Sequence, residues 1–461
     1  MPIIFIIIAI LFTIFVAIRP FKIGKIPINM ATGSLFALLI LLLLQVVNLE
    51  TVQLGILGNG QLRPWEIIVI FFSVAYVSVS TDVTGIFDFL AYKITCKSNG
   101  NGYKLFILVY LFTCVITVFT SNDIDILTLT PIIFYLSKHA KINVIPLLFA
   151  QFFATNIVSM FFYTGNPTNI IVANALNLGF LEYTKVMWLP TVIALIVNFL
   201  LLFIFFRKSI TKKFILNNNT HFEVRSWFDA ILSSTLLISM LVMLSLSEFI
   251  HVPIWIITVA FAIIFIIEDI LFGIYYKIKE SSLSTAQLQK GKDVYNIPEE
   301  KNEFWIAFKR IPWKILPFIF AFFIFVQGLY QYGVIDYFAT IISHFSTSLA
   351  SGIAISGFSS LILANIINNQ PMTIFFSNIL INDSFVVSET IFKGSAYAVV
   401  IASNLAASVT ILGALAGLMW KKILATKGLN ISYTDFLKKG ILITPIVFLA
   451  TLATLYLVLQ Y

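Results

Sequence analysis

Long apolar runs separated by short polar segments make up most of the chain. A run of about 20 apolar residues is long enough to cross a bilayer as a helix. About ten such runs can be read from the pattern, and they predict an all-α polytopic protein of the cytoplasmic membrane. The predicted spans are Ile3–Ile18, Pro27–Asn48, Ile67–Leu90, Ile142–Gly179, Met187–Phe206, Phe228–Phe249, Pro253–Tyr276, Pro312–Tyr332, Gly394–Trp420 and Ile441–Val458.

Two further apolar stretches carry polar residues at their centres and are expected to be re-entrant hairpins. The first, 105–138, is interrupted at Ser121–Asp123 and has lysines on both sides. Because basic residues mark the cytoplasmic side, the chain is expected to enter the membrane and turn back. The second, 349–383, is interrupted at Asn368–Pro371 and contains no lysine or arginine, which predicts a hairpin that opens to the outside.

Two of the predicted spans are interrupted and are expected to be broken helices. The run 142–179 is longer than one helix needs and contains Thr164–Asn169, where glycine and proline favour an unwound turn. The run 394–420 contains the polar stretch Ala402–Thr410. A hairpin precedes each broken helix, so the pattern predicts two inverted repeats, an architecture typical of ion-coupled secondary transporters.

This pattern divides the chain into four parts. Residues 1–26 are expected to be a retained N-terminal extra span and not a cleaved signal peptide. Residues 27–213 form the first inverted repeat, and 313–461 form the core of the second. Residues 214–312 supply connecting spans and a hydrophilic cytoplasmic loop at 277–309. The basic residues after the first span place the N-terminus outside. The last span exits again after the basic residues Lys421 and Lys422, so the C-terminus is also expected outside.

Composition and charge exclude several other classes of protein. The chain is 59% hydrophobic and 11% charged, whereas soluble domains are about 25% charged. The net charge of +8 comes from short clusters between apolar runs, which indicates membrane topology and not nucleic-acid binding. Two cysteines are too few for a disulfide framework or a metal cluster.

The sequence also favours transport over catalysis. It offers no activated nucleophile, no metal-ligand spacing and no long soluble domain, so neither an enzyme nor a cofactor is expected. It has no glycine-rich phosphate loop of the kind that an ATP-driven pump needs. A separate ATPase subunit stays an open alternative.

Polar groups at membrane depth are costly, so those in the hairpins and broken helices are the candidate binding site. Unwound backbone and half-helix N-termini can bind a cation or an anion, while Asp123 and Asp125 could exchange a proton or balance a bound cation. The candidate residues are Asn122, Asp123, Asp125, Thr130, Gly165, Asn166, Thr168, Asn169, Asn368, Asn369, Ser403, Asn404, Ser408 and Thr410, with Asn122, Gly165 and Asn169 as the candidate sodium ligands.

Structural roles compete with some of these assignments, and other acidic residues compete with the aspartates. Thr130 precedes a proline that could simply kink its helix, and Asn122 could act as a helix cap. Glu268 and Asp269 are expected to reach toward the cytoplasm or to pair with a neighbour. Asp82 lies near the inner end of its span, where an interfacial position costs little, and is a secondary candidate for transport.

Several motifs resemble the ion transporter superfamily. Asn122-Asp123 followed by Leu129–Ile132 is similar to the first hairpin of bacterial arsenite efflux permeases and citrate-transporter-like proteins, and Asn368–Pro371 is similar to their second hairpin tip. Where the arsenite permeases usually carry Asp and Lys in the second broken helix, this chain has Asn404 and Ser408. The turn around Gly165 resembles the sodium-binding turn of sodium-coupled carboxylate transporters.

The resemblance implies an ion-coupled secondary active transporter whose hairpins and broken helices move against a scaffold. Proton-coupled export of arsenite, antimonite or a related small oxyanion is the first expectation. A sodium-coupled di- or tricarboxylate carrier and a sodium/proton antiporter are alternatives, and saturable flux would distinguish any of these from a channel. The expected partners are a small inorganic or organic anion, membrane lipid and a second copy of the chain in a homodimer, but not nucleic acid.

Overall fold

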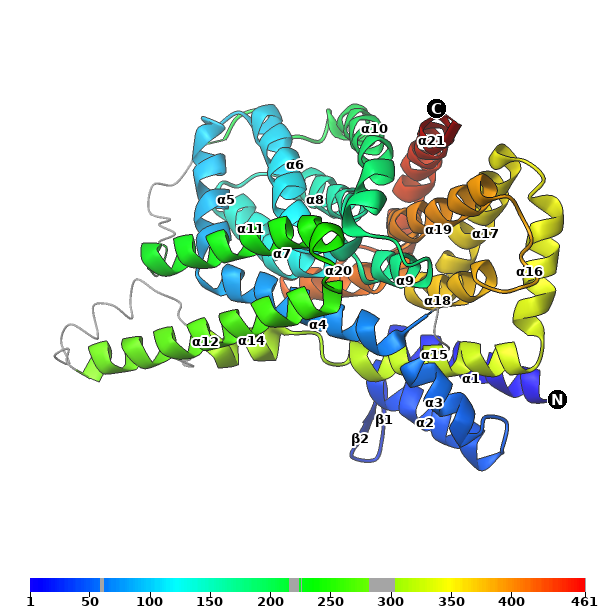
Figure 1. Ribbon diagram of the computed structural model, residues 1–461. Helices are drawn as coiled ribbons and strands as arrows, with labels where there is room; N and C mark the ends of the chain where they lie inside the picture. Colours follow the sequence, from blue (N-terminus) through cyan, green and yellow to red (C-terminus); the bar gives the residue numbers. More distant parts are fainter. Residues whose placement is uncertain (59–61, 215–223, 225, 282–302, 461) are drawn as a thin grey trace.

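The computed structural model describes residues 1–58, 62–214, 224, 226–281 and 303–460, and this part of the chain is almost entirely helical (Figure 1). Its first half comprises α1 (Pro2–Ile18), β1 (Phe21–Ile23), β2 (Ile26–Ile28), α2 (Met30–Leu43), α3 (Leu49–Leu57), α4 (Pro64–Val83), α5 (Ile86–Lys97), α6 (Gly102–Phe119), α7 (Asn122–His139), α8 (Ile145–Val158), the 3₁₀ turn η1 (Tyr163–Gly165), α9 (Pro167–Ala175) and α10 (Phe180–Phe206). Then follow α11 (Trp227–Ile250), α12 (Ile254–Ser281), α14 (Glu303–Arg310), α15 (Ile315–Gln331), α16 (Val334–Phe345), α17 (Leu349–Ile367), α18 (Asn369–Leu380), α19 (Glu389–Val409), η2 (Ile411–Gly413), α20 (Leu415–Thr426) and α21 (Tyr433–Gln460).

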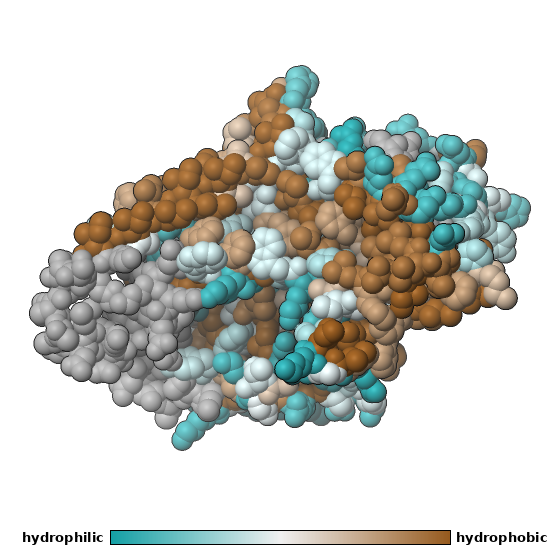
Figure 2. Space-filling view, turned by 90° about the horizontal axis from the view of Figure 1, so that it is seen from below, coloured by the Kyte–Doolittle hydropathy of each residue, from teal (hydrophilic) through white to brown (hydrophobic). Residues whose placement is uncertain are grey.

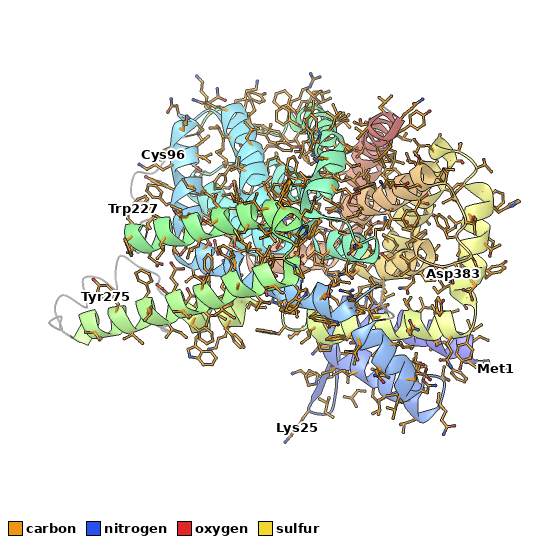
Figure 3. The ribbon with its side chains drawn as sticks, viewed as in Figure 1. Met1, Lys25, Cys96, Trp227, Tyr275 and Asp383 are labelled. Carbon is orange, nitrogen blue, oxygen red and sulfur yellow. The ribbon has the colours of Figure 1, made fainter. Side chains whose placement is uncertain are left out.

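The surface and the helix lengths are those of a multi-pass membrane protein. Within the described residues, nine helices are long and apolar enough to cross a membrane. Large apolar side chains such as Leu200 and Ile204 on α10 are 51% and 60% exposed, and Figure 2 shows broad continuous areas of apolar surface. Exposed aromatic residues such as Trp227 and Tyr275 lie near one end of the α11–α12 pair (Figure 3), as at a membrane interface. The prediction of an all-α, multi-pass membrane protein is confirmed.

The N-terminal region differs from the two full spans that the sequence predicts. The run Pro27–Asn48 yields α2, whose 14 residues extend about 21 Å, less than the roughly 30 Å of a hydrocarbon core. The side chain of Asn29 caps α2 by accepting from the backbone N–H of Ala31, which fixes its start. Before it, β1 and β2 form an antiparallel hairpin that the hydrophobic pattern does not predict.

Two other predicted boundaries shift. The predicted span Ile67–Leu90 is divided between α4 and α5, because Gly85 has φ +81° and begins a new helix there. The predicted loop 277–309 is shorter than expected, since α12 continues to Ser281 and α14 begins at Glu303. Residues 282–302 of that predicted loop lie outside the described residues.

The same order of elements occurs twice along the chain. α4, α5, the α6–α7 pair, the interrupted helix α8–η1–α9 and α10 match α15, α16, the α17–α18 pair, α19–η2–α20 and α21 in order. The short half-helices pack across this division, α9 against α18 and α7 against α20, and α10 packs against α21 (Figure 1). The inverted orientation of the two halves and the division into four parts stay predictions.

Candidate functional site

Both predicted hairpin tips are tight turns between two helices. In the first, α6 ends at Phe119 and α7 begins at Asn122. In the second, α17 ends at Ile367 and α18 begins at Asn369. The residue between them, Asn368, has φ +78°, a conformation that asparagine tolerates better than most residues. Each tip therefore places the N-terminus of a half-helix inside the protein.

Both broken helices are unwound at a short turn that requires glycine. η1 follows α8 and η2 follows α19. A Cβ atom added at Gly165 would collide with the backbone of Ser159, and one at Gly413 would collide with the backbone of Ala406. Each turn thus folds back against the end of its own helix, where only glycine leaves enough room. The second tip is attached to the second turn, because the side-chain amide of Asn368 donates to the carbonyl of Leu412 at 3.1 Å.

The side chain of Asn404 on α19 joins the two halves. Its Oδ1 accepts from Ser159 Oγ at 3.0 Å and from Asn166 Nδ2 at 2.9 Å. Its Nδ2 donates to Asn169 Oδ1 at 2.7 Å. All four side chains are buried, so this network holds the unwound turn of the first broken helix against the middle of the second.

A second set of contacts extends this network to the second hairpin tip. Ser403 Oγ donates to Thr168 Oγ1 at 3.0 Å, across the two halves. The amide nitrogen of Asn369 donates to the carbonyl of Ser403 at 3.1 Å. The residues that the structure brings together are therefore Asn166, Thr168, Asn169, Asn369, Ser403 and Asn404, all of them predicted from the sequence as candidates.

Buried polar oxygens without a partner are present at both hairpin tips. Ser121 Oγ and Asn122 Oδ1 at the first tip, and Asn369 Oδ1 and Gln370 Oε1 at the second, have no hydrogen bond with a described residue. Burying a polar atom without a partner is costly. These oxygens are therefore suited to contact a water, a cation or a polar substrate.

Asp123 and Asp125 lie in the first turn of α7 and are both buried. Asp125 Oδ2 accepts from Gln151 Nε2 at 3.0 Å and from the hydroxyl of Thr155, while its Oδ1 has no partner in the part of the chain that the structure describes. Asp123 makes no hydrogen bond or ion pair with a described residue. Because an ionised carboxylate without a cation is costly at membrane depth, both groups are suited to take up a proton or a cation.

Three candidates have contacts that also serve the fold. Thr130 Oγ1 donates to Gln151 Oε1 at 3.1 Å and so contacts α8 instead of a tip. Thr410 Oγ1 accepts from the backbone N–H of Gly413 at 3.1 Å and thereby caps η2. Ser408 is buried, its hydroxyl has no hydrogen-bond partner among the described residues, and its carbonyl accepts from Thr444 on α21. The ligand-binding roles of all the candidates stay predictions.

The sequence interpretation missed a polar stripe on α8. Gln151, Thr155 and Ser159 recur every fourth residue in a mostly apolar run, so they lie on one face of the helix. That face contacts Asp125 and Asn404. The four-residue spacing is a signal from which these residues could have been predicted.

Arg310 was also missed, and its position changes the interpretation of Asp82. Asp82 is buried at the end of α4, forms an ion pair with Arg310 of α14 and accepts from Thr128 Oγ1 at 3.0 Å. Its charge is thus balanced by a residue far along the chain, and it ties α4 to α7. The interfacial position of Asp82 and its secondary role in transport stay predictions.

Glu268 and Asp269 do not extend to the cytoplasm, since they are only 7% and 5% exposed. Of the two alternatives expected for them, the structure shows the second, contact with neighbouring side chains. Asp269 accepts from Tyr76 Oη at 2.5 Å and from Ser80 Oγ at 2.8 Å.

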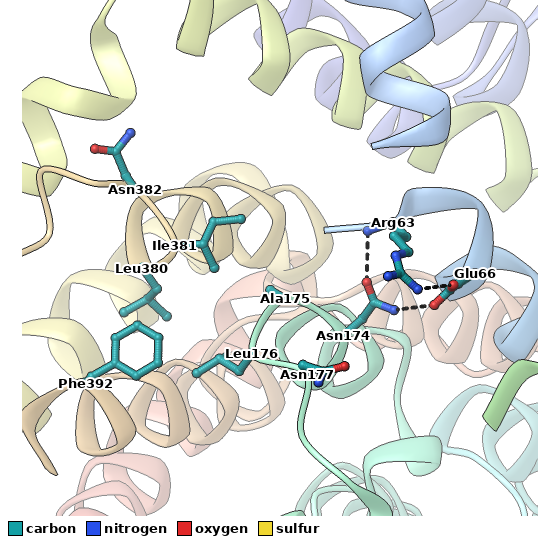
Figure 4. A pocket seen from close by; sticks show the side chains of 10 residues that line it. All are labelled: Arg63, Glu66, Asn174, Ala175, Leu176, Asn177, Leu380, Ile381, Asn382 and Phe392. Atoms are coloured by element: carbon teal, nitrogen blue, oxygen red, sulfur yellow. Dashed lines mark hydrogen bonds and ion pairs between the residues drawn. The ribbon is translucent and has the colours of Figure 1, made fainter. Parts of the chain in front are cut away.

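A polar cavity of about 530 Å³ lies at the C-terminal end of α9 (Figure 4). Asn174 there donates to Glu66 at 3.1 Å and accepts from the backbone N–H of Arg63 at 2.9 Å, and Arg63 pairs with Glu66 at 2.8 Å. A neighbouring cavity of about 470 Å³ shares these residues and extends to Tyr163 in η1. The second cavity therefore reaches a residue of the unwound turn.

The chain is similar in sequence to known membrane transport proteins. A family model described as a citrate transporter matches residues 3–384. The arsenical pump membrane protein of Escherichia coli is 26% identical over 397 residues, which cover 85% of this chain and 86% of that protein. The arsenical pump membrane protein of Yersinia enterocolitica is 27% identical over 408 residues, which cover 85% of this chain and 86% of that protein.

Proposed function

The chain belongs to the citrate transporter family and is a membrane transporter, and from this premise we propose that it exports arsenite, antimonite or a related small oxyanion in exchange for protons. The similarity to arsenical pump membrane proteins over most of both chains supports this choice of substrate. In this proposal the coupling ion is a proton and no cofactor takes part.

The observation that carries the proposal is the arrangement of four half-helices. α7, α9, α18 and α20 all begin at the tips or the unwound turns, and hydrogen bonds connect the starts of α9 and α18 to the same part of α19. A helix N-terminus carries a partial positive charge and free N–H groups. The starts of α9 and α18, which are buried and held against the same part of α19, therefore favour an oxyanion or a hydroxylated substrate such as arsenite.

The buried aspartates supply the coupling in this proposal. Asp123 and Asp125 lie at the start of α7, beside the unpaired oxygens of Ser121 and Asn122. No basic side chain of the described residues pairs with either carboxylate. Each can therefore take up a proton on one side of the membrane and release it on the other, as exchange for substrate requires.

A specific observation also favours a second candidate, a sodium-coupled di- or tricarboxylate carrier. The unpaired amide oxygens of Asn122 and Asn369 are neutral ligands of the kind that hard cations prefer. Asn169 at the unwound turn is held by the carbonyls of Ser159 and Phe162, at 2.8 and 3.2 Å. A sodium ion near the tips would suit these neutral oxygens, and the bound substrate would then be a carboxylate.

Flux measurements with the purified full-length protein distinguish the two candidates. Everted vesicles and proteoliposomes would be given arsenite, citrate or succinate under an imposed proton or sodium gradient. The proposal predicts saturable arsenite accumulation in everted vesicles driven by an inside-acid proton gradient, without a requirement for sodium. Sodium-driven carboxylate uptake without arsenite flux would contradict it and favour the second candidate. Unsaturable flux that follows no ion gradient would indicate a channel.

A further inference from the structure

Two buried carboxyl groups lie outside the site described above. Glu268 and Asp269 are in α12, within the stretch Ile254–Tyr275 that is apolar enough to cross a membrane. On the same turns Ile267 and Leu271 are 53% and 61% exposed, as expected for side chains that face lipid. The two acids face the other way and are 7% and 5% exposed. They are therefore buried inside the protein at membrane depth.

Among the described residues, the hydrogen-bond partners of these carboxyl groups are all hydroxyl groups. Asp269 accepts from Tyr76 and Ser80 of α4, at 2.5 and 2.8 Å. Glu268 Oε1 accepts from Ser233 of α11 at 3.0 Å, and Glu268 Oε2 has no hydrogen-bond partner among the described residues. Neither acid forms an ion pair with a described basic residue.

The charged groups on the neighbouring helices do not compensate these two acids. α11 carries the buried Asp229, which contacts Ser233, and α14 carries the buried Glu303. Both have interactions of their own elsewhere. Arg310 on α14 is paired with Asp82. The titratable groups from α4, α11 and α14 that face the pair are thus a phenol and further acids, so the negatively charged form of Glu268 or Asp269 would be costly.

We propose that Glu268 and Asp269 form a second proton-binding site of this transporter, separate from the hairpin tips. A proton fits better than a metal ion, because the two side chains hydrogen-bond toward different helices, Glu268 toward α11 and Asp269 toward α4. In the described residues, no three or more histidine, cysteine or acidic side chains are grouped to hold a metal. Protonated Glu268 is neutral and carries an O–H group that can donate a hydrogen bond. Protonated Asp269 is also neutral and can still accept hydrogen bonds from both of its hydroxyl partners.

The geometry also gives this site a consequence for packing. The hydrogen bonds of Asp269 link α12 to α4, and that of Glu268 links α12 to α11. Loss of the two protons would place two negative charges between three apolar helices, which weakens that packing. Proton occupancy of this pair therefore sets how firmly α12 is held, independently of which substrate the tips bind.

Infrared difference spectroscopy of the full-length protein in liposomes tests the proposal without any transport assay. Spectra recorded at alkaline and acidic pH would show the carbonyl band of a protonated carboxyl group appearing on acidification. We expect Glu268→Gln and Asp269→Asn each to remove part of this band, while Asp383→Asn, at an exposed position, leaves the buried-carboxyl band unchanged. A spectrum that is the same in both variants and in the wild type would overturn the proposal.

Two further measurements guard against misfolded variants and against a metal ion. Tyr76→Phe removes only the hydroxyl group that donates to Asp269. The carbonyl band of Asp269 should therefore change frequency without disappearing. An unchanged frequency would contradict the assignment to Asp269. Added sodium at constant pH should leave the carbonyl band intact. If sodium abolished the band, the pair would be a sodium site and not a proton site. Failure of arsenite transport would overturn the proposed substrate but would leave these spectra unaffected.

Discussion

At the scale of single residues, the molecule depends on a few buried amides. Asn404 uses both ends of its side chain, accepting from Ser159 and Asn166 and donating to Asn169. An amide can do this because it carries both donors and an acceptor without a charge. A neutral side chain at this position suits a site in which the substrate and the coupling ion carry the charges.

Replacing Asn404 should therefore damage both stability and transport. Asn404→Ala leaves the buried side-chain Nδ2 of Asn166 and Oδ1 of Asn169 unpaired, and each costs about 1–3 kcal/mol. We expect a total loss of about 2–5 kcal/mol in stability and a fall in transport of about tenfold or more, since about 1.4 kcal/mol already corresponds to that factor. Thermal unfolding in detergent and initial uptake rates would measure the two effects.

The matched control is Asn430→Ala, which removes an exposed asparagine between α20 and α21. It should leave both quantities close to those of the wild type. Equal uptake by Asn404→Ala and Asn430→Ala would show that the side-chain amide of Asn404 is not part of the transport site.

Sequence reasoning found the amides but not all of their partners. Asn166, Asn169 and Asn404 are visible because polar residues interrupt apolar runs. The ion pair between Asp82 and Arg310 joins residues 228 positions apart, and no local pattern predicts such a contact. The buried positions of Glu268 and Asp269 likewise depend on how α12 packs, which the spacing to the nearest lysine does not indicate.

At the scale of elements, the two unwound turns determine where the half-helices begin. η1 and η2 each fold back on the preceding helix at a glycine, and each precedes a half-helix of the site. Glycine and proline in an apolar run were sufficient to predict the first break. The interruption of 394–420 was predicted from polar residues alone, since Gly413 lies just after them.

A methyl group added at the glycine of η1 should therefore destabilise the protein more than one added at a glycine within a helix. Gly165→Ala would place its Cβ against the backbone of Ser159, which cannot move without shifting α8. We expect a destabilisation of about 1–3 kcal/mol, with loss of transport. Gly357→Ala is the matched control, because its Cβ would meet Leu452 Cδ1 at 3.1 Å, a flexible side chain that can give way. Normal transport by Gly165→Ala would mean that the turn tolerates rearrangement.

Other elements were mispredicted because hydrophobicity alone does not set helix length. Pro27–Asn48 is apolar enough for a span, but the cap at Asn29 and the preceding β-hairpin shorten it to α2. Gly85 similarly divides a run that hydrophobicity presents as continuous. Helix caps and left-handed turns are local signals that compete with the apolar pattern. At Asn29 and Gly85 they determine where the helices begin.

At the scale of the whole molecule, the account requires the two hairpins to enter from opposite sides of the membrane. Cysteine labelling would test this orientation. After replacement of Cys96 and Cys114 by serine, Lys25→Cys in the β1–β2 turn and Asp383→Cys after α18 would each supply one exposed thiol (Figure 3). A membrane-impermeant maleimide should label position 383 in right-side-out vesicles and position 25 in inverted ones. Labelling of both from one side would contradict the predicted topology.

The central claim is that substrate bound at the converging tips is exchanged for protons carried by the aspartates of α7. The most direct test is arsenite-driven proton movement in proteoliposomes that contain a pH-sensitive dye, for the wild type and for Asp123→Asn. Asp123 has no partner among the described residues, so the substitution changes its charge and not its contacts. We predict proton movement opposite to arsenite in the wild type and none in Asp123→Asn, with equal insertion. Undiminished proton-coupled flux in the variant would remove Asp123 from the mechanism and contradict the account.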